Sequence, residues 1–317
     1  MFLTITMNTA LDKTLSVPSF MIGGRHRASS SVTQPGGKGI NVARALRLLG
    51  HPVIASGLAG GRTGLRIIEE LTFEGILNDF VRIADEARMS IAVVDPTGGA
   101  EVTEINEYGP VVSEAELALF VEKARYLVKG ASWVVLAGSL PRRVDEGFYA
   151  TLCRELRRGS VKGIVLDTDG EPMRQAIRAE PAIVFPNARE AEELVGHEFT
   201  DQADLVAGVA ELCALGAQEA VITFDFGAVA RLTVGRGQSA TYVGTGFALE
   251  PVSTVGSGDA FLAAFLAARD HGASPEDALR RGLGCAAANT QMFGAGRFDP
   301  AAAAVYADRV TVEQVDG

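Results

Sequence analysis

The chain has 317 residues, of which 47% are hydrophobic and 21% are charged, and it contains 36 glycines. This is an ordinary composition for a soluble globular protein, with enough chain to bury a large core. A formal net charge of −10 without a basic stripe excludes a nucleic-acid backbone as the expected partner, and no apolar run is long enough to span a bilayer, so we expect no membrane partner either.

Short apolar runs alternate with stretches of helical periodicity through most of the chain. The runs that predict buried strands, rich in Val, Ile and Leu, are residues 2–7, 133–137, 163–167, 182–185 and 220–224. The stretches that predict helices are residues 39–49, 62–74, 114–129, 145–158, 171–179, 188–195, 202–215 and 259–270. This alternation predicts an α/β fold with a parallel sheet covered by helices on both faces.

Two segments in the first third of the chain break this alternation. Residues 88–94 and 101–106 are strand-like and flank a Pro/Gly turn at 95–99, which is typical of a hairpin. Residues 12–34 lack helical periodicity. We therefore expect a single domain over residues 1–317, with a small antiparallel lid formed by about 12–34 and 88–107.

Polar turn residues follow each of four predicted strands. The segments are Asn8-Thr9-Ala10-Leu11-Asp12, Gly138-Ser139-Leu140-Pro141, Thr168-Asp169-Gly170-Glu171 and Pro186-Asn187-Ala188-Arg189-Glu190. Each segment alone could be ordinary turn chemistry. Because ligands of parallel sheets bind beyond the carboxyl ends of the strands, the four together predict a ligand-binding rim at one edge of the sheet.

A first glycine cluster opens the helix predicted at 39–49. Its sequence is Pro35-Gly36-Gly37-Lys38-Gly39-Ile40-Asn41. A lysine at a helix start makes a good anion site, although a glycine-rich turn with a solvated lysine is the alternative. The spacing fits neither a Walker A loop nor a dinucleotide-binding GxGxxG motif.

A second glycine cluster opens the helix predicted at 259–270. In Thr254-Val255-Gly256-Ser257-Gly258-Asp259, the glycines let backbone N–H groups approach an anion at the helix start. Asp259 is either a helix cap or a base that accepts a proton from an attacking hydroxyl. Two separate anion sites fit a phosphotransferase that holds two phosphorylated molecules.

The cysteines and histidines form no metal-binding pattern. Cys153, Cys213 and Cys285 lie far apart without CxxC spacing, and the four histidines form no HxxxH or HExxH pair. We therefore expect reduced thiols in a cytoplasmic protein and no zinc site.

The motifs together resemble those of the PfkB family of carbohydrate kinases, which has the ribokinase-like fold. The resemblance covers nearly the whole chain, because the two glycine clusters, the segment at 138–141 and the segment at 187–190 occur in the family's order. It implies a three-layer αβα sandwich with a central, mostly parallel sheet and a small antiparallel β lid. Within the family, the chain resembles the 1-phosphofructokinase and tagatose-6-phosphate kinase branch at residues 4–12, residues 103–107, Lys38 and Ser253.

The resemblance also implies site residues. Asp259 would be the catalytic base, and the N–H groups of Gly256, Ser257 and Gly258 would form an anion hole. The substrate-binding residues would be Asp12, Gly36, Gly37, Lys38, Asn41, Arg88, Asn106 and Ser139. Of these, Lys38, Arg88 and Ser139 would hold the phosphate already on the sugar. The nucleotide-binding residues would be Asn187, Thr223, Gly227, Thr254, Gly256, Gly258 and Asn289. Asn187 and Glu190 would position the metal, partly through water.

The activity implied is ATP- and Mg²⁺-dependent phosphorylation of a ketohexose monophosphate, with fructose 1-phosphate to fructose 1,6-bisphosphate as the leading reaction. Tagatose 6-phosphate or fructose 6-phosphate as acceptor is the close alternative. A ribose or nucleoside kinase fits less well, since those acceptors carry no phosphate for Lys38 and Arg88 to meet. The resemblance further implies a homodimer formed through the lid.

Two departures from the family pattern lie in the nucleotide half. Phe185 stands where the family usually has a lysine, and the turn at 223–227 is one residue short and carries Asp225. Loss of a charge-assisted contact weakens binding by roughly 1.5–3 kcal/mol, so reduced ATP affinity is one expectation. Arg189 is a candidate substitute for the missing cation. A sugar-phosphate-binding protein with a degraded ATP site is therefore the second hypothesis.

Overall fold

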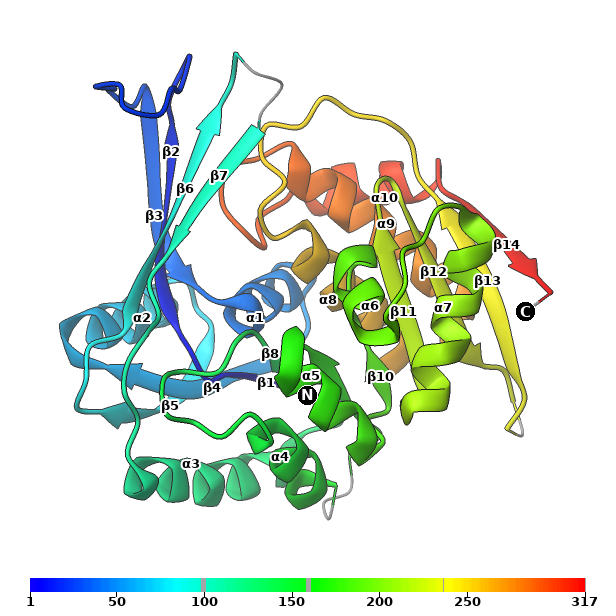
Figure 1. The fold of residues 1–317 in the computed structure, drawn as a ribbon, viewed down its shortest axis with the longest axis horizontal. Helices are drawn as coiled ribbons and strands as arrows, with labels where there is room; N and C mark the ends of the chain where they lie inside the picture. The colour runs from blue at the N-terminus through cyan, green and yellow to red at the C-terminus, as the bar shows by residue number, and fades with distance from the viewer. Residues whose placement is uncertain (98–100, 158–160, 236, 317) are drawn as a thin grey trace.

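The computed structural model of the protein describes residues 1–97, 101–157, 161–235 and 237–316. A large sheet crosses the molecule (Figure 1). Within these ranges ten strands lie in the order β14-β13-β12-β11-β10-β9-β8-β1-β4-β5. The parallel ones are β1 (Phe2–Thr6), β4 (Val53–Gly60), β5 (Leu77–Ile83), β8 (Trp133–Ala137), β9 (Gly163–Asp167), β10 (Ile183–Val184) and β11 (Glu219–Phe224). An antiparallel extension adds β12 (Gly227–Thr233), β13 (Ser239–Thr245) and β14 (Thr311–Val315). The expectation of a mostly parallel sheet is confirmed.

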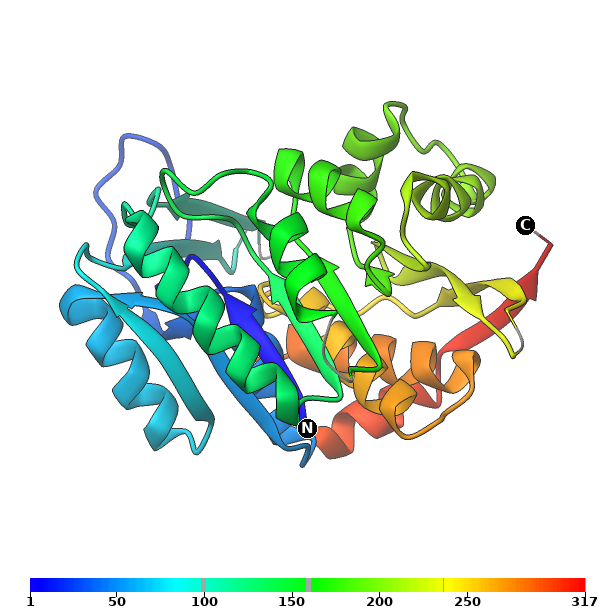
Figure 2. The same cartoon turned by 90° about the horizontal axis from the view of Figure 1, so that it is seen from below.

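Helices cover both faces of this sheet (Figure 2). One layer contains α1 (Lys38–Leu48), α2 (Gly61–Phe73), α8 (Ser257–Asp270), α9 (Pro275–Thr290) and α10 (Pro300–Ala307). The other contains α3 (Glu114–Leu127), α4 (Phe148–Leu156), α5 (Gly170–Ala176), α6 (Ala188–Val195) and α7 (Gln202–Leu215). Two short 3₁₀ helices lie at Val128–Gly130 and Ile177–Ala179. Among the described residues, no helix is both long and apolar enough to cross a membrane.

The central strands β1, β8 and β9 are mostly apolar because they bury both of their faces. In β1, Phe2 packs into the core beneath α1 and α8, while Leu3 and Ile5 pack into the core beneath α3 and α4. Successive side chains of a strand point to opposite faces, so the central strands of a sheet between two helical layers favour apolar residues on both faces. This confirms the three-layer αβα sandwich.

A second sheet stands beside the first and forms the lid (Figure 1). Its order is β3-β2-β6-β7, with β2 (Ala10–Ser16), β3 (Ser30–Gly36), β6 (Arg88–Asp95) and β7 (Glu101–Asn106). The β6–β7 and β2–β3 pairs are antiparallel, as expected, but β2 and β6 pair in parallel. The lid is therefore mixed, because β2 and β6 both leave the main sheet in the same direction. The glycines of the predicted hairpin turn, at 98–99, lie outside the described residues.

Candidate active site

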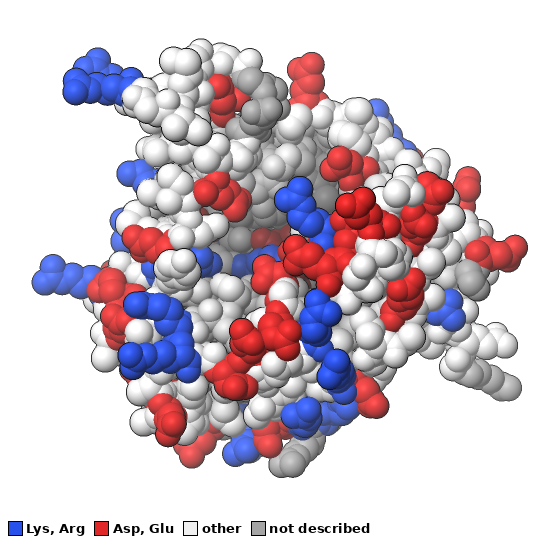
Figure 3. Space-filling model, viewed as in Figure 1, with Lys and Arg blue, Asp and Glu red and all other residues white. Residues whose placement is uncertain are grey.

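Two cavities meet between the lid and the carboxyl ends of the parallel strands. The smaller cavity, of about 530 Å³, lies against the lid, and the larger, of about 740 Å³, extends toward β11, β12 and α9. They share one wall, which contains Asn187, Thr223, Thr254, Ser257 and Gly258. Figure 3 shows a hollow on this face with side chains of both charges at its margin. Two molecules could therefore lie end to end across a single wall.

The second glycine cluster forms this shared wall. Gly256 has φ 80°, a left-handed conformation that favours glycine, and a Cβ there would come within 2.5 Å of Ala295. A Cβ on Gly258 would meet nothing within 4 Å, so the backbone faces open space. The first N–H groups of an α-helix lack intrahelical partners. Ser257 N donates over 3.3 Å to Thr254 O within the turn, which leaves the N–H groups of Gly256 and Gly258 as the donors at the start of α8.

Asp259 is not the cap of α8. The cap position is Gly256, which has no side-chain cap, and Asp259 lies two residues inside the first turn. Its Oδ2 accepts a hydrogen bond of 2.9 Å from Nδ2 of Asn41, and its carboxyl group lines the smaller cavity. Burial and the nearby Asp167 carboxylate raise the pKa of Asp259 to about 7, against the opposing effects of Lys38 and Asn41. A carboxylate with that pKa is well matched to proton transfer near neutral pH.

Lys38 lies in the same cavity as Asp259, although more than two hundred residues separate them. Its Nζ is 2.7 Å from Oδ1 of Asp167 and 3.6 Å from Oε1 of Glu190. Burial opposes its charge, but the two carboxylates outweigh burial and raise the pKa of Lys38, so the side chain stays cationic. The cation is therefore held within the smaller cavity, between two carboxylates.

Asp167 is a residue that the sequence analysis missed. It is the last residue of β9, it is buried, and it is the ion-pair partner of Lys38. The prediction took residues 163–167 as one buried strand and placed the polar turn after it. A charged residue ending an otherwise apolar strand, at the edge where the other motifs gather, is the signal that could have found it.

The lid contributes polar residues to the opposite wall of the smaller cavity. Asp12 on β2, Arg88 on β6 and Asn106 at the end of β7 all line it. Burial raises the pKa of Asp12 to about 6, with Arg88 opposing this shift. Gly36 does not line the cavity but lies behind Asp12, where a Cβ would overlap the carboxyl group. The structure thus brings the lid residues and Lys38 around one space.

Ser139 is joined to Arg88 by Asn8. The Nδ2 of Asn8 donates to Oγ of Ser139 over 3.1 Å, and Nε of Arg88 donates to the backbone oxygen of Asn8 over 3.4 Å. Ser139 is not among the residues that line the smaller cavity, but the preceding Gly138 packs near Lys38. Asn8 is therefore the residue that places the β8 turn beside the base of the lid.

The larger cavity is lined mainly by apolar side chains and by backbone. Gly227, Phe226, Leu249 and Leu283 are among its lining residues. Asn289, expected among the ligand contacts, does not line either cavity. Its buried Nδ2 donates to Val255 O, and its Oδ1 accepts from Arg297 N. This corrects the expectation: the buried Asn289 holds the two loops behind the shared wall and reaches neither cavity.

Comparison with known proteins identifies the family. Residues 5–302 match the model of the pfkB family of carbohydrate kinases. The chain belongs to that family. Among its relatives, 1-phosphofructokinase of Borreliella burgdorferi is 32% identical over 283 residues, 89% of this chain and 89% of that protein. The 1-phosphofructokinase of Bacillus subtilis is 30% identical over 300 residues, 94% of this chain and 96% of that protein.

Solved structures agree with this assignment. A possible 1-phosphofructokinase from Thermotoga maritima matches with a TM-score of 0.89 at 27% identity, over 100% of both chains. Phosphofructokinase-2 from Escherichia coli, in complex with substrates and products, matches with a TM-score of 0.86 at 26% identity, over 97% of this chain and 98% of that one. The resemblance found in the sequence, the ribokinase-like fold and the assignment as a carbohydrate kinase are confirmed.

The departures in the nucleotide half of this kinase leave its larger cavity open. Phe185 packs against Phe261 with ring centroids 5.1 Å apart, so the aromatic ring is part of the core beneath the wall. Arg189 is exposed in the first turn of α6 and lines the larger cavity. Asp225 also lines it but is exposed, where solvent screens its charge. The geometry leaves Arg189 in position as the candidate substitute cation.

Asn187 and Glu190 form a reciprocal cap at the start of α6. Glu190 N donates to Oδ1 of Asn187, and Asn187 N donates to Oε2 of Glu190, each over 2.9 Å. The remaining oxygen, Oε1 of Glu190, lies 3.6 Å from Lys38 Nζ in the smaller cavity. In the described ranges no three His, Cys, Asp or Glu side chains are grouped to hold a metal. Such a sparse oxygen donor set fits Mg²⁺, which keeps waters and binds through one or two carboxylates and substrate phosphates.

Proposed function

We propose that this kinase transfers the terminal phosphoryl group of ATP to the free primary hydroxyl of a ketohexose monophosphate. Fructose 1-phosphate, giving fructose 1,6-bisphosphate, is the leading substrate. The observation that carries the proposal is the wall shared by two cavities, where the free N–H groups of α8 lie beside the Asp259 carboxylate. Phosphoryl transfer between two bound molecules needs an anion cradle between them and a base facing the acceptor.

Each part of the wall has a role in this proposal. Asp259 would accept the proton of the sugar hydroxyl as that oxygen bonds to the γ-phosphorus, while the bond from that phosphorus to the bridging oxygen breaks and ADP leaves. The N–H groups at Gly256, Ser257 and Gly258 would stabilise the negative charge of the transferring group as it crosses the wall. Lys38, held at 2.7 Å by Asp167, would add a fixed cation in the smaller cavity.

The acceptor would lie in the smaller cavity. Asp12, Gly37 and Asn41 would bind the sugar, and Arg88 with Asn106 would lie toward the phosphate that it already carries. Ser139 would join this phosphate site through Asn8, which ties it to Arg88. Arg88 is half-buried, and its guanidinium donates to the backbone oxygens of Asn8 and Glu107. A guanidinium in this position is a suitable ligand for such a phosphate.

The donor would lie in the larger cavity. Its apolar walls suit the base of a nucleotide, while Asn187, Thr223, Thr254 and Gly227 lie where the phosphates would meet the shared wall. Asn187 and Glu190, partly through water, would hold Mg²⁺. When bound, the ion neutralises charge on the phosphates of the donor.

A coupled assay with ATP and Mg²⁺ over a panel of hexoses tests the proposal. The panel contains fructose 1-phosphate, fructose 6-phosphate, tagatose 6-phosphate, free fructose and ribose. We expect the highest kcat/KM for fructose 1-phosphate, as the names of the similar proteins suggest, and little turnover of unphosphorylated sugars. Equal turnover of free fructose and its phosphate would contradict a built site for a substrate phosphate. Sugar-phosphate binding without turnover would favour the second hypothesis of a binding protein.

We also propose that the kinase is a cytoplasmic homodimer that pairs through the lid. The lid segments expose the large apolar side chains of Met21 and Ile22, between β2 and β3, and of Ile105 on β7, and the exposed Tyr108 follows β7. Exposed apolar groups are typical of interaction sites when they gather in one patch. Light scattering should therefore give about twice the 33.3 kDa mass of the chain, and a monomer at micromolar concentration would contradict the pairing. The three free cysteines fit a reducing compartment.

A further inference from the structure

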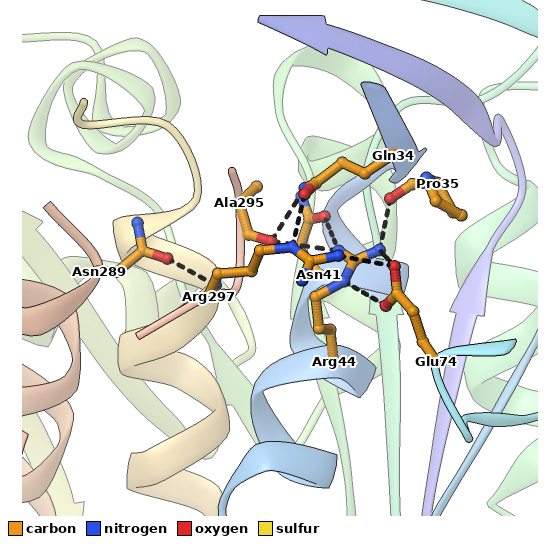
Figure 4. A network of polar contacts seen from close by, with 8 residues as sticks. All are labelled: Gln34, Pro35, Asn41, Arg44, Glu74, Asn289, Ala295 and Arg297. Carbon is orange, nitrogen blue, oxygen red and sulfur yellow. Dashed lines mark hydrogen bonds and ion pairs between the residues drawn. The ribbon is translucent and has the colours of Figure 1, made fainter. Parts of the chain in front are cut away.

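A buried arginine lies behind the catalytic wall and contacts neither cavity. Arg44 is on α1, one turn after Asn41, and its side chain is 4% exposed. Figure 4 shows its guanidinium at the centre of a polar network that joins four separate segments of the chain. Burying a charge is costly unless it is paired and hydrogen-bonded, so a residue in this position needs a compensating role.

The guanidinium group is fully engaged. Its Nε donates to Oε2 of Glu74 over 2.6 Å, and its Nη2 donates to the backbone oxygen of Pro35 over 2.7 Å. Its Nη1 donates to Oδ1 of Asn41 and to the backbone oxygen of Ala295, each over 3.1 Å. One side chain therefore connects the base of the lid, α1, the end of α2 and the loop that packs on Gly256.

The contact with Asn41 fixes the orientation of an amide. Arginine has only donors, so Asn41 must turn its carbonyl oxygen toward Arg44 and its NH₂ group toward Asp259. The Nδ2 of Asn41 then donates to Oδ2 of Asp259 and leaves Oδ1 of Asp259 for the acceptor hydroxyl. Without Arg44 the amide could rotate by a half-turn and present an oxygen to the carboxylate.

We propose that Arg44 is a positioning residue for phosphoryl transfer: acting through Asn41, it holds Asp259 with one oxygen engaged and the other free for the proton of the acceptor. The Glu74 carboxylate keeps Arg44 in place and is itself held by Arg297, whose Nη2 lies 2.9 Å from Glu74 Oε1. This inference rests on the proposed function, since it assigns Asp259 the role of base.

The test is a double-mutant cycle with Arg44→Lys, Asn41→Ala and both together. Arg44→Lys keeps the charge but cannot bind Asn41 and Glu74 at once. Loss of the Asn41 donor destabilises the charged form of Asp259, so its pKa should rise by about half to one unit. Because the base works unprotonated, the acidic limb of kcat should move to higher pH in Arg44→Lys, with kcat about three- to eightfold lower near pH 6.5 and each KM within about twofold. The charges that face Asp259 from its neighbouring elements, Asp167, Lys38 and Asp12, are unchanged in these variants.

The readout that does not depend on turnover is the ¹³C carboxyl signal of Asp259 in selectively labelled protein, assigned by its loss in Asp259→Asn. If the unmodified chain phosphorylates no sugar, the proposed function fails, and this titration still decides the inference. Arg44→Lys should raise the pKa of Asp259 when Asn41 is present and have no further effect on it in the Asn41→Ala background. If Arg44→Lys raises this pKa equally with and without Asn41, or does not change it, the inference is overturned.

Two further variants complete the experiment. Arg47→Lys is the matched control, because Arg47 is exposed on the same helix and donates to the backbone oxygen of Gly75. It should leave both the titration and kcat unchanged. If Arg44→Lys does not fold, the pair Arg44→Gln/Glu74→Gln removes both buried charges together and carries the same prediction. If Asp259 has the same pKa in that double variant as in the native chain, the inference is also overturned.

Discussion

Asp259→Asn should lower kcat by about two to four orders of magnitude, while the KM for the sugar phosphate changes only a few-fold. The amide has the shape of the carboxyl group and still offers an oxygen to Asn41 Nδ2, so the contact that positions it can persist. What is lost is the carboxylate that lines the smaller cavity beside the glycine turn, where it would accept the acceptor's proton. Initial rates and calorimetric titration with sugar phosphate separate the two effects.

A matched control is available on the next helix. Asp277 is the third residue of α9, as Asp259 is the third residue of α8, but it is exposed and paired with Arg280. Asp277→Asn should leave kcat within about twofold. Full activity in Asp259→Asn would show that Asp259 is not the catalytic base. Loss of activity in both Asp259→Asn and Asp277→Asn would point to a general effect on folding.

Local backbone chemistry made much of the fold predictable. The helices at Ala188–Val195 and Gln202–Leu215 and the strands at 133–137 and 163–167 lie where the sequence pattern places them. These segments carry their own signals, such as the caps Asn187 and Asp201 or an uninterrupted β-branched run. The glycine turn at 256–258 was predictable for the same reason, since it depends on backbone conformation alone.

Elements with weak local signals were missed. Strand β4 reads Val-Ile-Ala-Ser-Gly-Leu-Ala-Gly, in which small residues replace the β-branched ones, and its glycines allow close approach to β1. In the antiparallel β12–β14 extension, small and polar residues interrupt the apolar ones, and only β14 is mostly exposed. Helix α9 contains two internal glycines that lower its helix propensity. Packing against neighbouring elements, namely β1 for β4, β11 for β12 and α8 for α9, decides these elements, and the sequence does not display such packing.

Side-chain partners across the chain were the least predictable part of the site. The motif identified Lys38, but its partner Asp167 is 129 residues away and was read as the end of a strand. The Arg44–Glu74–Arg297 network joins residues that have no sequence pattern in common. The prediction placed Asn289 among the nucleotide-binding residues, but its side chain contacts Val255 and Arg297 behind the shared wall. A polar residue near the end of a helix gives no indication in the sequence of which way its side chain faces.

Lys38→Met should lower kcat by about two to three orders of magnitude, with a smaller rise in KM. If Lys38 only held the phosphate already on the sugar, KM would carry most of the effect. Its Nζ, however, lies between Asp167 and Glu190 in the cavity that Asp259 also lines, close enough to Asp259 to lower its pKa, so we expect Lys38 to act on the group in transfer. Removing the cation leaves two carboxylates near the incoming phosphoryl group, so repulsion adds to the loss of attraction.

Lys162→Met is the control for this substitution. The Nζ of Lys162 is 2.7 Å from Oδ1 of Asp270, the same separation as in the Lys38–Asp167 pair, but the lysine is exposed and lines neither cavity. A surface pair of this kind contributes little, so kcat and the melting temperature should stay near those of the native chain. If Lys38→Met raises KM but leaves kcat within about threefold of the native value, the role of Lys38 is to bind the substrate phosphate and not the transferring group. The cation at the shared wall would then have to come from Arg189 or from the metal.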